Sequence, residues 1–153
     1  MTDVSEAAEA AWVALVRAHR VATARVEADL KAAGLPPLAW YDALWELTRA
    51  PAGLRPGALE ARLLLAQYNV SRLLDRLEAA GLVEKSADPE DARARIVRLT
   101  AAGRRMREAM WPVYAAAIEA AVGARLSGRQ ARTLAALLRR LAAGDDEPDG
   151  RPA

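Results

Sequence analysis

The stretch from residue 55 to residue 100 constrains the fold most, because it joins a strongly periodic helix to two short strands. The helix is predicted to begin near Gln67 and to end before Gly81, since glycine commonly terminates helices. Its apolar side chains recur at the spacing of one buried face, at Val70, Leu73, Leu74 and Leu77. The other side carries polar side chains, chiefly Gln67, Tyr68, Asn69, Ser71, Arg72 and Arg76. Such side chains reach base edges and phosphates from a major groove, although any amphipathic helix has a polar face.

A charged hairpin is predicted directly after this helix. Residues 82–86 and 93–99 mix β-branched and charged side chains, and residues 87–92 between them contain a proline and three acids. A hairpin in this position is a wing, and it would place Arg93 and Arg95 against a DNA backbone or minor groove. Asp91 is spaced to support the wing by pairing with the guanidinium of Arg93. The alternative is a solvated acidic turn that carries ordinary surface arginines.

Three motifs follow one another in this segment. Residues 75–83 read Asp-Arg-Leu-Glu-Ala-Ala-Gly-Leu-Val, residues 88–93 read Asp-Pro-Glu-Asp-Ala-Arg, and residues 97–103 read Val-Arg-Leu-Thr-Ala-Ala-Gly. In order and spacing they resemble the MarR family of bacterial transcription regulators, and residues 35–42 resemble the start of that family's second helix. Two positions depart from the pattern, since Ala92 replaces the first of two wing arginines and Ala66 replaces a Ser or Thr helix cap. Asn69 or Gln67 would then cap the helix, or the helix starts later.

The resemblance covers about residues 35–103 and implies both a fold and a function. The fold would be mainly α with a small two-stranded β wing, a winged helix-turn-helix with long dimerisation helices. The function would be that of a homodimeric regulator, a ligand-responsive repressor, that binds a pseudo-palindromic operator in double-stranded DNA. In that family a small, often aromatic effector binds near the helix junction and weakens DNA binding.

The flanking segments are predicted to be long helices. We expect one domain over residues 1–143, with a winged helix-turn-helix lobe at 34–103 and dimerisation helices at 3–33 and 101–143. The second of these divides into a helix at about 101–125 and another that begins at a capping box, Ser127–Gln130, and runs to about Ala143. The acidic residues 144–153 are expected to form a disordered tail.

A short helix is also expected after Arg55-Pro56-Gly57, with Leu59, Leu63 and Leu64 facing inward. It would cross the DNA backbone while the next helix enters the groove. Arg55 is therefore a candidate phosphate contact, although ordinary surface charge explains it equally well.

Aromatic residues are concentrated in the second predicted helix, which runs from Pro36-Pro37 to about Arg49. Aromatic side chains make up only 5% of the chain, so three of them within six residues there call for an explanation. One reading is core packing, because such rings dominate burial. The other is an apolar effector pocket between the first, second and fifth helices, with candidate residues Trp12, His19, Trp40, Tyr41, Trp45, Trp111 and Tyr114.

Composition limits the remaining functions. Cysteine is absent and histidine occurs once, so we expect no transition-metal site, no cofactor and no catalytic constellation. No apolar stretch is long enough to cross a membrane and no secretory signal is evident, so a cytoplasmic location is expected. Residues 55–105 hold ten Lys and Arg against seven Asp and Glu, a modest net charge of +3.

A second function remains open on these grounds. The acids at Asp75 and Glu78 and the modest charge would also suit a winged-helix protein-interaction module that does not bind DNA. A salt titration of duplex binding separates the two hypotheses, because a DNA-binding regulator loses affinity steeply as salt rises.

Overall fold

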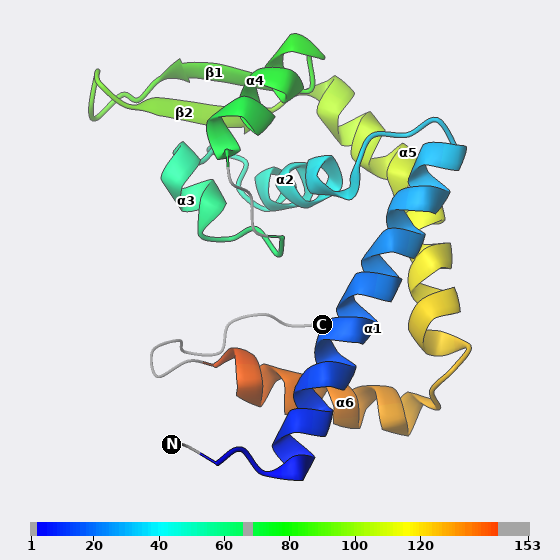
Figure 1. The fold of residues 1–153 in the computed structure, drawn as a ribbon. Coiled ribbons are helices and arrows are strands. Elements are labelled where there is room, and N and C mark those ends of the chain that lie inside the picture. Colours follow the sequence, from blue (N-terminus) through cyan, green and yellow to red (C-terminus); the bar gives the residue numbers. More distant parts are fainter. Residues whose placement is uncertain (1–2, 66–68, 144–153) are drawn as a thin grey trace.

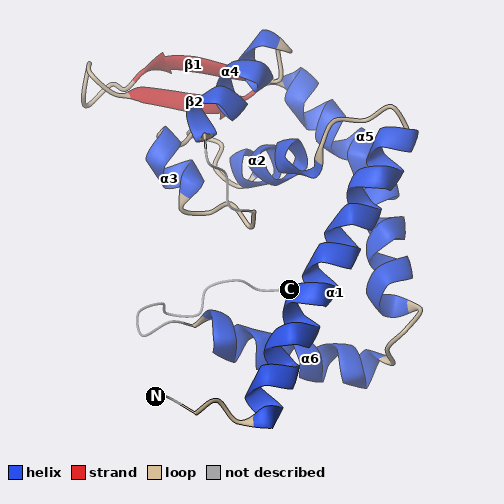
Figure 2. Cartoon of the chain, in the orientation of Figure 1, coloured by secondary structure: helices blue, strands red, loops and turns tan. Residues whose placement is uncertain are grey.

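The computed structural model describes residues 3–65 and 69–143 of the 153-residue chain. It is mainly helical with one two-stranded sheet, so the predicted fold class is confirmed (Figures 1 and 2). The elements in chain order are α1 (Glu6–Ala32), α2 (Leu38–Thr48), α3 (Pro56–Glu60), α4 (Val70–Ala79), β1 (Val83–Ala87), β2 (Arg95–Leu99), α5 (Ala101–Ile118), the π-helical turn η1 (Glu119–Gly123) and α6 (Gly128–Ala142).

The helices and the sheet enclose two hydrophobic cores. The first core joins α2, α3, α4 and the sheet through buried residues that include Leu44, Leu47, Leu59, Leu74, Leu77 and Val97. The second joins α1, α2 and α5 through Val26, Leu30, Leu38, Tyr41, Met110 and Ala117. Figure 1 shows α1 and α5 running side by side away from the winged part, toward α6. Helix α2 belongs to both cores and is therefore the joint between the two parts.

Helix α4, the predicted recognition helix, begins three residues later than its expected start. Its first turn is capped by Asn69, whose side-chain oxygen accepts the Arg72 backbone N–H at 2.8 Å. The capping residue does not itself adopt helical geometry, so the helix starts at Val70, one residue after Asn69. This is one of the alternatives left open by the sequence, whereas Ala66, Gln67 and Tyr68 lie outside the described residues.

The first of the three motifs, residues 75–83, forms the end of α4 and the turn after it. Gly81 adopts a positive φ of 72°, and the N–H of Leu82 donates to the Leu77 carbonyl at 2.9 Å. This is the usual glycine ending of a helix, and a side chain at that position would be strained. The turn places Leu82 and Val83 in the first core, so the motif directs the chain from the helix into the wing.

The motif after β2 fixes the start of α5 in a similar way. The Thr100 hydroxyl accepts the Gly103 N–H at 3.0 Å and donates to the Gly81 carbonyl at 2.7 Å. Gly103 is buried, and a Cβ atom there would overlap the carbonyl oxygen of Leu82. The threonine and the glycine thus lock the start of α5 against the end of α4.

The wing is antiparallel, with Val83 paired to Leu99 and Ala87 paired to Arg95. Its second strand begins later than predicted, because residues 93 and 94 belong to the turn. An isolated bridge between Leu54 and Val97 adds a third short segment on the inner side of β2. The wing is therefore attached to the chain that precedes α3 as well as to α4.

Other boundaries also shift. Helix α1 starts at Glu6 behind a Ser5 cap, not at Asp3, and α-helical geometry in α5 ends at Ile118 because η1 follows. The predicted capping box at Ser127 is confirmed, but the predicted inward position of Leu64 is wrong, since Leu64 is 65% exposed. None of the helices in the described ranges is long and apolar enough to cross a membrane.

Candidate nucleic-acid interface and ligand pocket

The exposed face of α4 carries the side chains that the sequence assigned to DNA. Ser71, Arg72 and Arg76 are exposed, while Val70, Leu73, Leu74 and Leu77 are buried in the first core. Arg72 and Arg76 are four residues apart and so project from the same face of the helix. Asn69 caps the helix through its side-chain oxygen, which is one of the roles that the sequence left open, and its predicted DNA contact stays a prediction.

Lys85 of β1 pairs with the acids on α4. Its ammonium lies 2.5 Å from an oxygen of Asp75 and 3.9 Å from an oxygen of Glu78, and its backbone N–H donates to Glu78 at 3.2 Å. These two acids were the reason to consider a face without DNA. Lys85 offsets one of their two negative charges, and the same contacts join the wing to α4.

The start of the wing turn is held by a buried carboxylate, Asp88. One of its oxygens accepts Nε of Arg55 at 2.7 Å, and the other accepts the backbone N–H of Glu90 at 2.9 Å. The Glu90 hydrogen bond, together with Arg55, lowers the pKa of Asp88 below its usual value against the opposing effect of burial. The Arg55 guanidinium pairs with Asp88 and its side chain is 48% exposed, so its predicted phosphate contact stays a prediction.

Asp91 shapes the wing tip through the backbone. The pairing predicted between its carboxylate and the Arg93 guanidinium is wrong: the carboxylate accepts the Arg93 backbone N–H at 3.0 Å. The Asp91 carbonyl accepts the Ala94 N–H at 3.0 Å, which closes the turn. Arg93 and Arg95 are exposed, and neither forms an ion pair with any residue that the structure describes.

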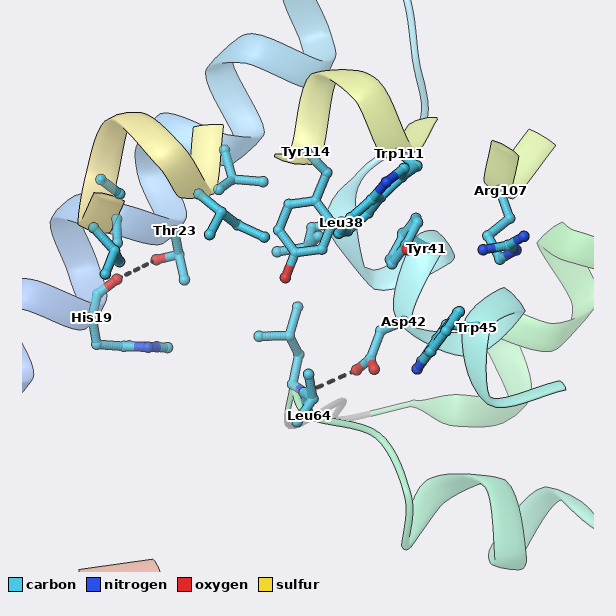
Figure 3. Close-up of a pocket in the computed structure, with 16 residues that line it drawn as sticks. His19, Thr23, Leu38, Tyr41, Asp42, Trp45, Leu64, Arg107, Trp111 and Tyr114 are labelled. Carbon is cyan, nitrogen blue, oxygen red and sulfur yellow. Dashed lines mark hydrogen bonds between the residues drawn. The ribbon is translucent and has the colours of Figure 1, made fainter. Parts of the chain in front are cut away.

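A cavity of about 700 Å³ lies between α1, α2 and α5 (Figure 3). Of the seven residues predicted to line an effector pocket, five do so, namely His19, Tyr41, Trp45, Trp111 and Tyr114. The rings of Tyr41 and Trp111 stack with centroids 6.0 Å apart, and Tyr114 meets Tyr41 edge-on at 5.0 Å. The aromatic residues thus form a wall that suits a flat apolar molecule.

The other two predicted residues do not line this cavity. Trp12 lies two turns before His19 on α1 and is 66% exposed. Trp40 packs against the first core instead. Helix α2 is buried on two faces, and Trp40 points to the face of Leu44 and Leu47, whereas Tyr41 and Trp45 point to the cavity.

Polar residues of the cavity wall were missed by the sequence analysis, Asp42 and Arg107 above all. Asp42 is 5% exposed and accepts the Leu65 backbone N–H at 3.0 Å, and Arg107 lies over the Trp45 ring at 5.4 Å. Burial raises the pKa of Tyr41, with Arg107 opposing it, and burial together with the charges of Asp42 and Tyr41 raises the pKa of Tyr114. Both tyrosines therefore present neutral hydroxyl groups at pH 7. The sequence feature that could have identified Asp42 is an acidic residue among the apolar residues of a predicted helix.

Comparison with known proteins agrees with this geometry. A family model described as "MarR family" matches residues 33–94. YkoM of Bacillus subtilis (strain 168), an uncharacterized HTH-type transcriptional regulator, is 34% identical over 68 residues, which are 44% of this chain and 43% of YkoM. That match thus spans less than half of either protein. The fold of Sco3205 from Streptomyces coelicolor, a MarR family transcriptional regulator crystallised in complex with DNA, is similar with a TM-score of 0.83 at 22% identity, over 93% of this chain and 89% of that one.

The resemblance seen in the sequence is thereby confirmed: residues 33–94 match the MarR family model, and the fold is that of a MarR-like winged helix-turn-helix. YkoM and Sco3205 are both transcriptional regulators, in agreement with the non-enzymatic function that the sequence predicts. BpsR of Bordetella bronchiseptica, whose DNA binding is regulated by 6-hydroxynicotinic acid, has a similar fold with a TM-score of 0.80 at 23% identity, over 94% of this chain and 100% of BpsR. In this MarR-like wing Ala92 lies exposed, so the missing arginine removes a surface charge and leaves the turn intact.

The Arg55–Asp88 pair gives a prediction for this MarR wing. Asp88→Ala should raise the exchange rate of the Glu90 amide hydrogen on the order of tenfold, because a buried acceptor is removed, as measured by NMR. In the native protein, protection of this amide should stay constant from pH 7 to about pH 4. The pKa of Asp88 in the folded protein is below the unfolded value of 3.8. The stability that the ionised carboxylate adds is therefore fully present above pH 3.8, and it is lost as the pH falls through the folded pKa.

Glu84→Ala is the matched control, because it removes an exposed acid from the neighbouring strand. Protection that already declines between pH 7 and pH 5, or an Asp88→Ala variant that exchanges at the native rate, would show that Asp88 does not hold the wing.

Proposed function

We propose that this protein binds double-stranded DNA in a sequence-specific manner as a homodimer, and that a small aromatic molecule regulates this binding. The observation that carries the proposal is the pair of exposed arginines on α4 next to a wing that exposes Arg93 and Arg95. Arg72 and Arg76 form no ion pair with any described residue, whereas the neighbouring Asp75 pairs with Lys85. The crystal structure of Sco3205 in complex with DNA supports this reading.

The two parts of the interface have different tasks in this proposal. Helix α4 enters the major groove, where Asn69, Ser71, Arg72 and Arg76 contact bases and phosphates together with Gln67 and Tyr68, which lie outside the described residues. Arg93 and Arg95 of the wing bind the backbone or the adjacent minor groove. Arg55 acts mainly by holding Asp88, and so by keeping the wing beside the groove.

A second copy of the chain would cover the apolar surface of α1 and α6. Helix α6 has no buried residue, although its apolar side chains recur on one face, and the first half of α1 is equally uncovered. The exposed apolar residues of these two segments are Trp12, Val13, Val16, Leu134, Leu137 and Leu141. Monomeric proteins rarely expose such continuous apolar surface. A twofold dimer would present two α4 helices about 34 Å apart, which suits a pseudo-palindromic operator.

The cavity between α1, α2 and α5 is the proposed effector site. Its aromatic wall and neutral tyrosine hydroxyls suit a flat molecule that carries a polar group. Regulation of BpsR by 6-hydroxynicotinic acid, a flat ring with polar groups, provides a precedent in a similar fold. Occupancy of the cavity would lower operator affinity, so that the protein acts as a ligand-responsive repressor.

Arg72→Ala and Arg93→Ala should weaken DNA binding in different ways. Arg72→Ala is expected to weaken operator binding roughly tenfold or more and random duplexes much less, because a base contact contributes to discrimination. Arg93→Ala should weaken both by similar factors and reduce the slope of log affinity against log salt by about 0.9, because it removes one phosphate contact. Fluorescence anisotropy measures both, with an operator identified by protection mapping upstream of the protein's own coding region.

Arg25→Ala, which removes an equal charge from an ion pair on α1, serves as the control. Equal losses for the two DNA sequences in Arg72→Ala would exclude base reading by this residue. A salt-insensitive affinity of the native protein would instead favour a protein-interaction module.

Leu137→Arg should convert the dimer to a monomer, because it places a charge at the centre of the apolar face of α6. Sedimentation equilibrium should give twice the 16.4 kDa chain mass for the native protein and a single chain mass for the variant. Ala136→Arg adds the same charge on the opposite side of α6 and should remain dimeric. A native monomer at micromolar concentration, or a dimeric Leu137→Arg variant, would argue against this interface.

Binding of an aromatic probe should be visible through the tryptophans of the cavity. Titration with 6-hydroxynicotinic acid or phenol is expected to change the intrinsic fluorescence, because Trp45 and Trp111 line the cavity. Trp12→Phe should retain this change, since Trp12 lies outside the cavity, whereas Trp111→Phe should lose much of it. An identical response in the two variants would place the probe elsewhere, and no response to either probe would count against an aromatic effector.

A further inference from the structure

A single buried carboxylate links the cavity to the segment that leads into α4. Asp42 lies on α2 at the cavity wall, is 5% exposed, and accepts the backbone N–H of Leu65 at 3.0 Å (Figure 3). The side chains of Leu64 and Leu65 also line the cavity, and Leu65 packs against the second core. Asp42, which accepts this hydrogen bond, and the side chain of Leu65, whose N–H donates it, therefore both lie in the cavity wall.

Leu65 lies close in sequence to the start of α4. Three residues separate it from Asn69, the helix cap, so the Cα atoms of Leu65 and Asn69 lie at most about 14 Å apart. Helix α4 has only ten residues, and an isolated helix of that length is marginal in water. Its first turn therefore depends on where the preceding backbone is held, and Asp42 is the side chain that holds Leu65.

We propose that Asp42 is a positioning residue that fixes the start of α4 from the wall of the cavity. The effect on DNA binding rests on the proposed function, in which α4 is the helix that enters the DNA groove. A molecule that fills the cavity must contact Leu64 and Leu65, and displacing them breaks the Asp42–Leu65 hydrogen bond. The cap at Asn69 then loses its fixed position, and operator affinity falls. By reciprocity, bound DNA holds the hydrogen bond in place and disfavours the ligand.

This link differs from the other supports of α4. The contacts of Lys85 with Asp75 and Glu78 join the helix to the wing, and Gly81 with Thr100 fixes its end. Neither support touches the cavity. Among the hydrogen bonds between described residues, the Asp42–Leu65 contact is the one that joins the cavity wall to the chain just before the recognition helix.

Amide hydrogen exchange tests the proposal in the absence of DNA and ligand. In Asp42→Ala the Leu65 amide should exchange on the order of tenfold faster or more, because it loses a charged acceptor. The Arg72 amide, which donates to the Asn69 cap, should lose protection with it. Asp42→Asn keeps an acceptor oxygen and should protect both amides nearly as well as the native residue. Asp29→Ala, a carboxylate removed from α1, is the matched control.

If Asp42→Ala does not fold, Asp42→Leu takes its place, because an apolar side chain of similar volume is often tolerated where a buried charge is removed. Unchanged exchange at Leu65, or faster exchange at Leu65 with native protection at Arg72, would overturn the proposal. Operator affinity provides the second readout and should fall about tenfold in Asp42→Ala but not in Asp42→Asn. A native protein that binds no duplex would contradict the proposed function, whereas the exchange result would still decide whether Asp42 positions α4.

Discussion

Packing of helix α2 into two hydrophobic cores is the constraint on which the rest of the structure depends. Leu44 and Leu47 are buried against the winged part, while Leu38 and Tyr41 are buried against α1 and α5. Its first turn has no side-chain cap of its own, and Glu27 of α1 instead accepts the Leu38 N–H at 3.2 Å. A shift of α2 relative to α1 therefore disturbs both cores and this hydrogen bond. A structural change in one core is thus transmitted to the other through α2.

The acids of the winged part explain how a modest net charge can still present a positive surface. Residues 55–105 have a net charge of only +3, but Asp88 is engaged by Arg55, Asp75 by Lys85, and Asp91 by the backbone of Arg93. These three acids thus hold the wing and α4, whereas Arg72, Arg76, Arg93 and Arg95 are exposed and form no ion pair within the described part of the chain. Charge distribution, not charge total, decides whether such a surface attracts phosphate.

The sequence predicted what depends on local pattern. The buried face of α4, the hairpin, the Ser127 capping box and the glycine ending at Gly81 all follow from spacing or from backbone preferences, and the structure has them. The Arg55–Asp88 and Asp42–Leu65 contacts join residues 33 and 23 positions apart, and no local pattern specifies them. Trp40 was misassigned for a related reason: a helix buried on two faces has apolar residues all round, so periodicity cannot tell which core each one faces.

The arrangement of the supports around α4 determines what a ligand in the cavity would change. The middle and the end of the helix are held by Lys85 and by Gly81 with Thr100, and these contacts do not involve the cavity. Among the contacts between described residues, the Asp42–Leu65 hydrogen bond is the one that ties the segment before α4 to the cavity. Disturbing that one contact would loosen the first turn, where Asn69 and Arg72 lie, and leave the body of the helix folded in its core. Such a local change costs far less than unfolding the winged part, so the modest binding energy of a small molecule is sufficient to drive it.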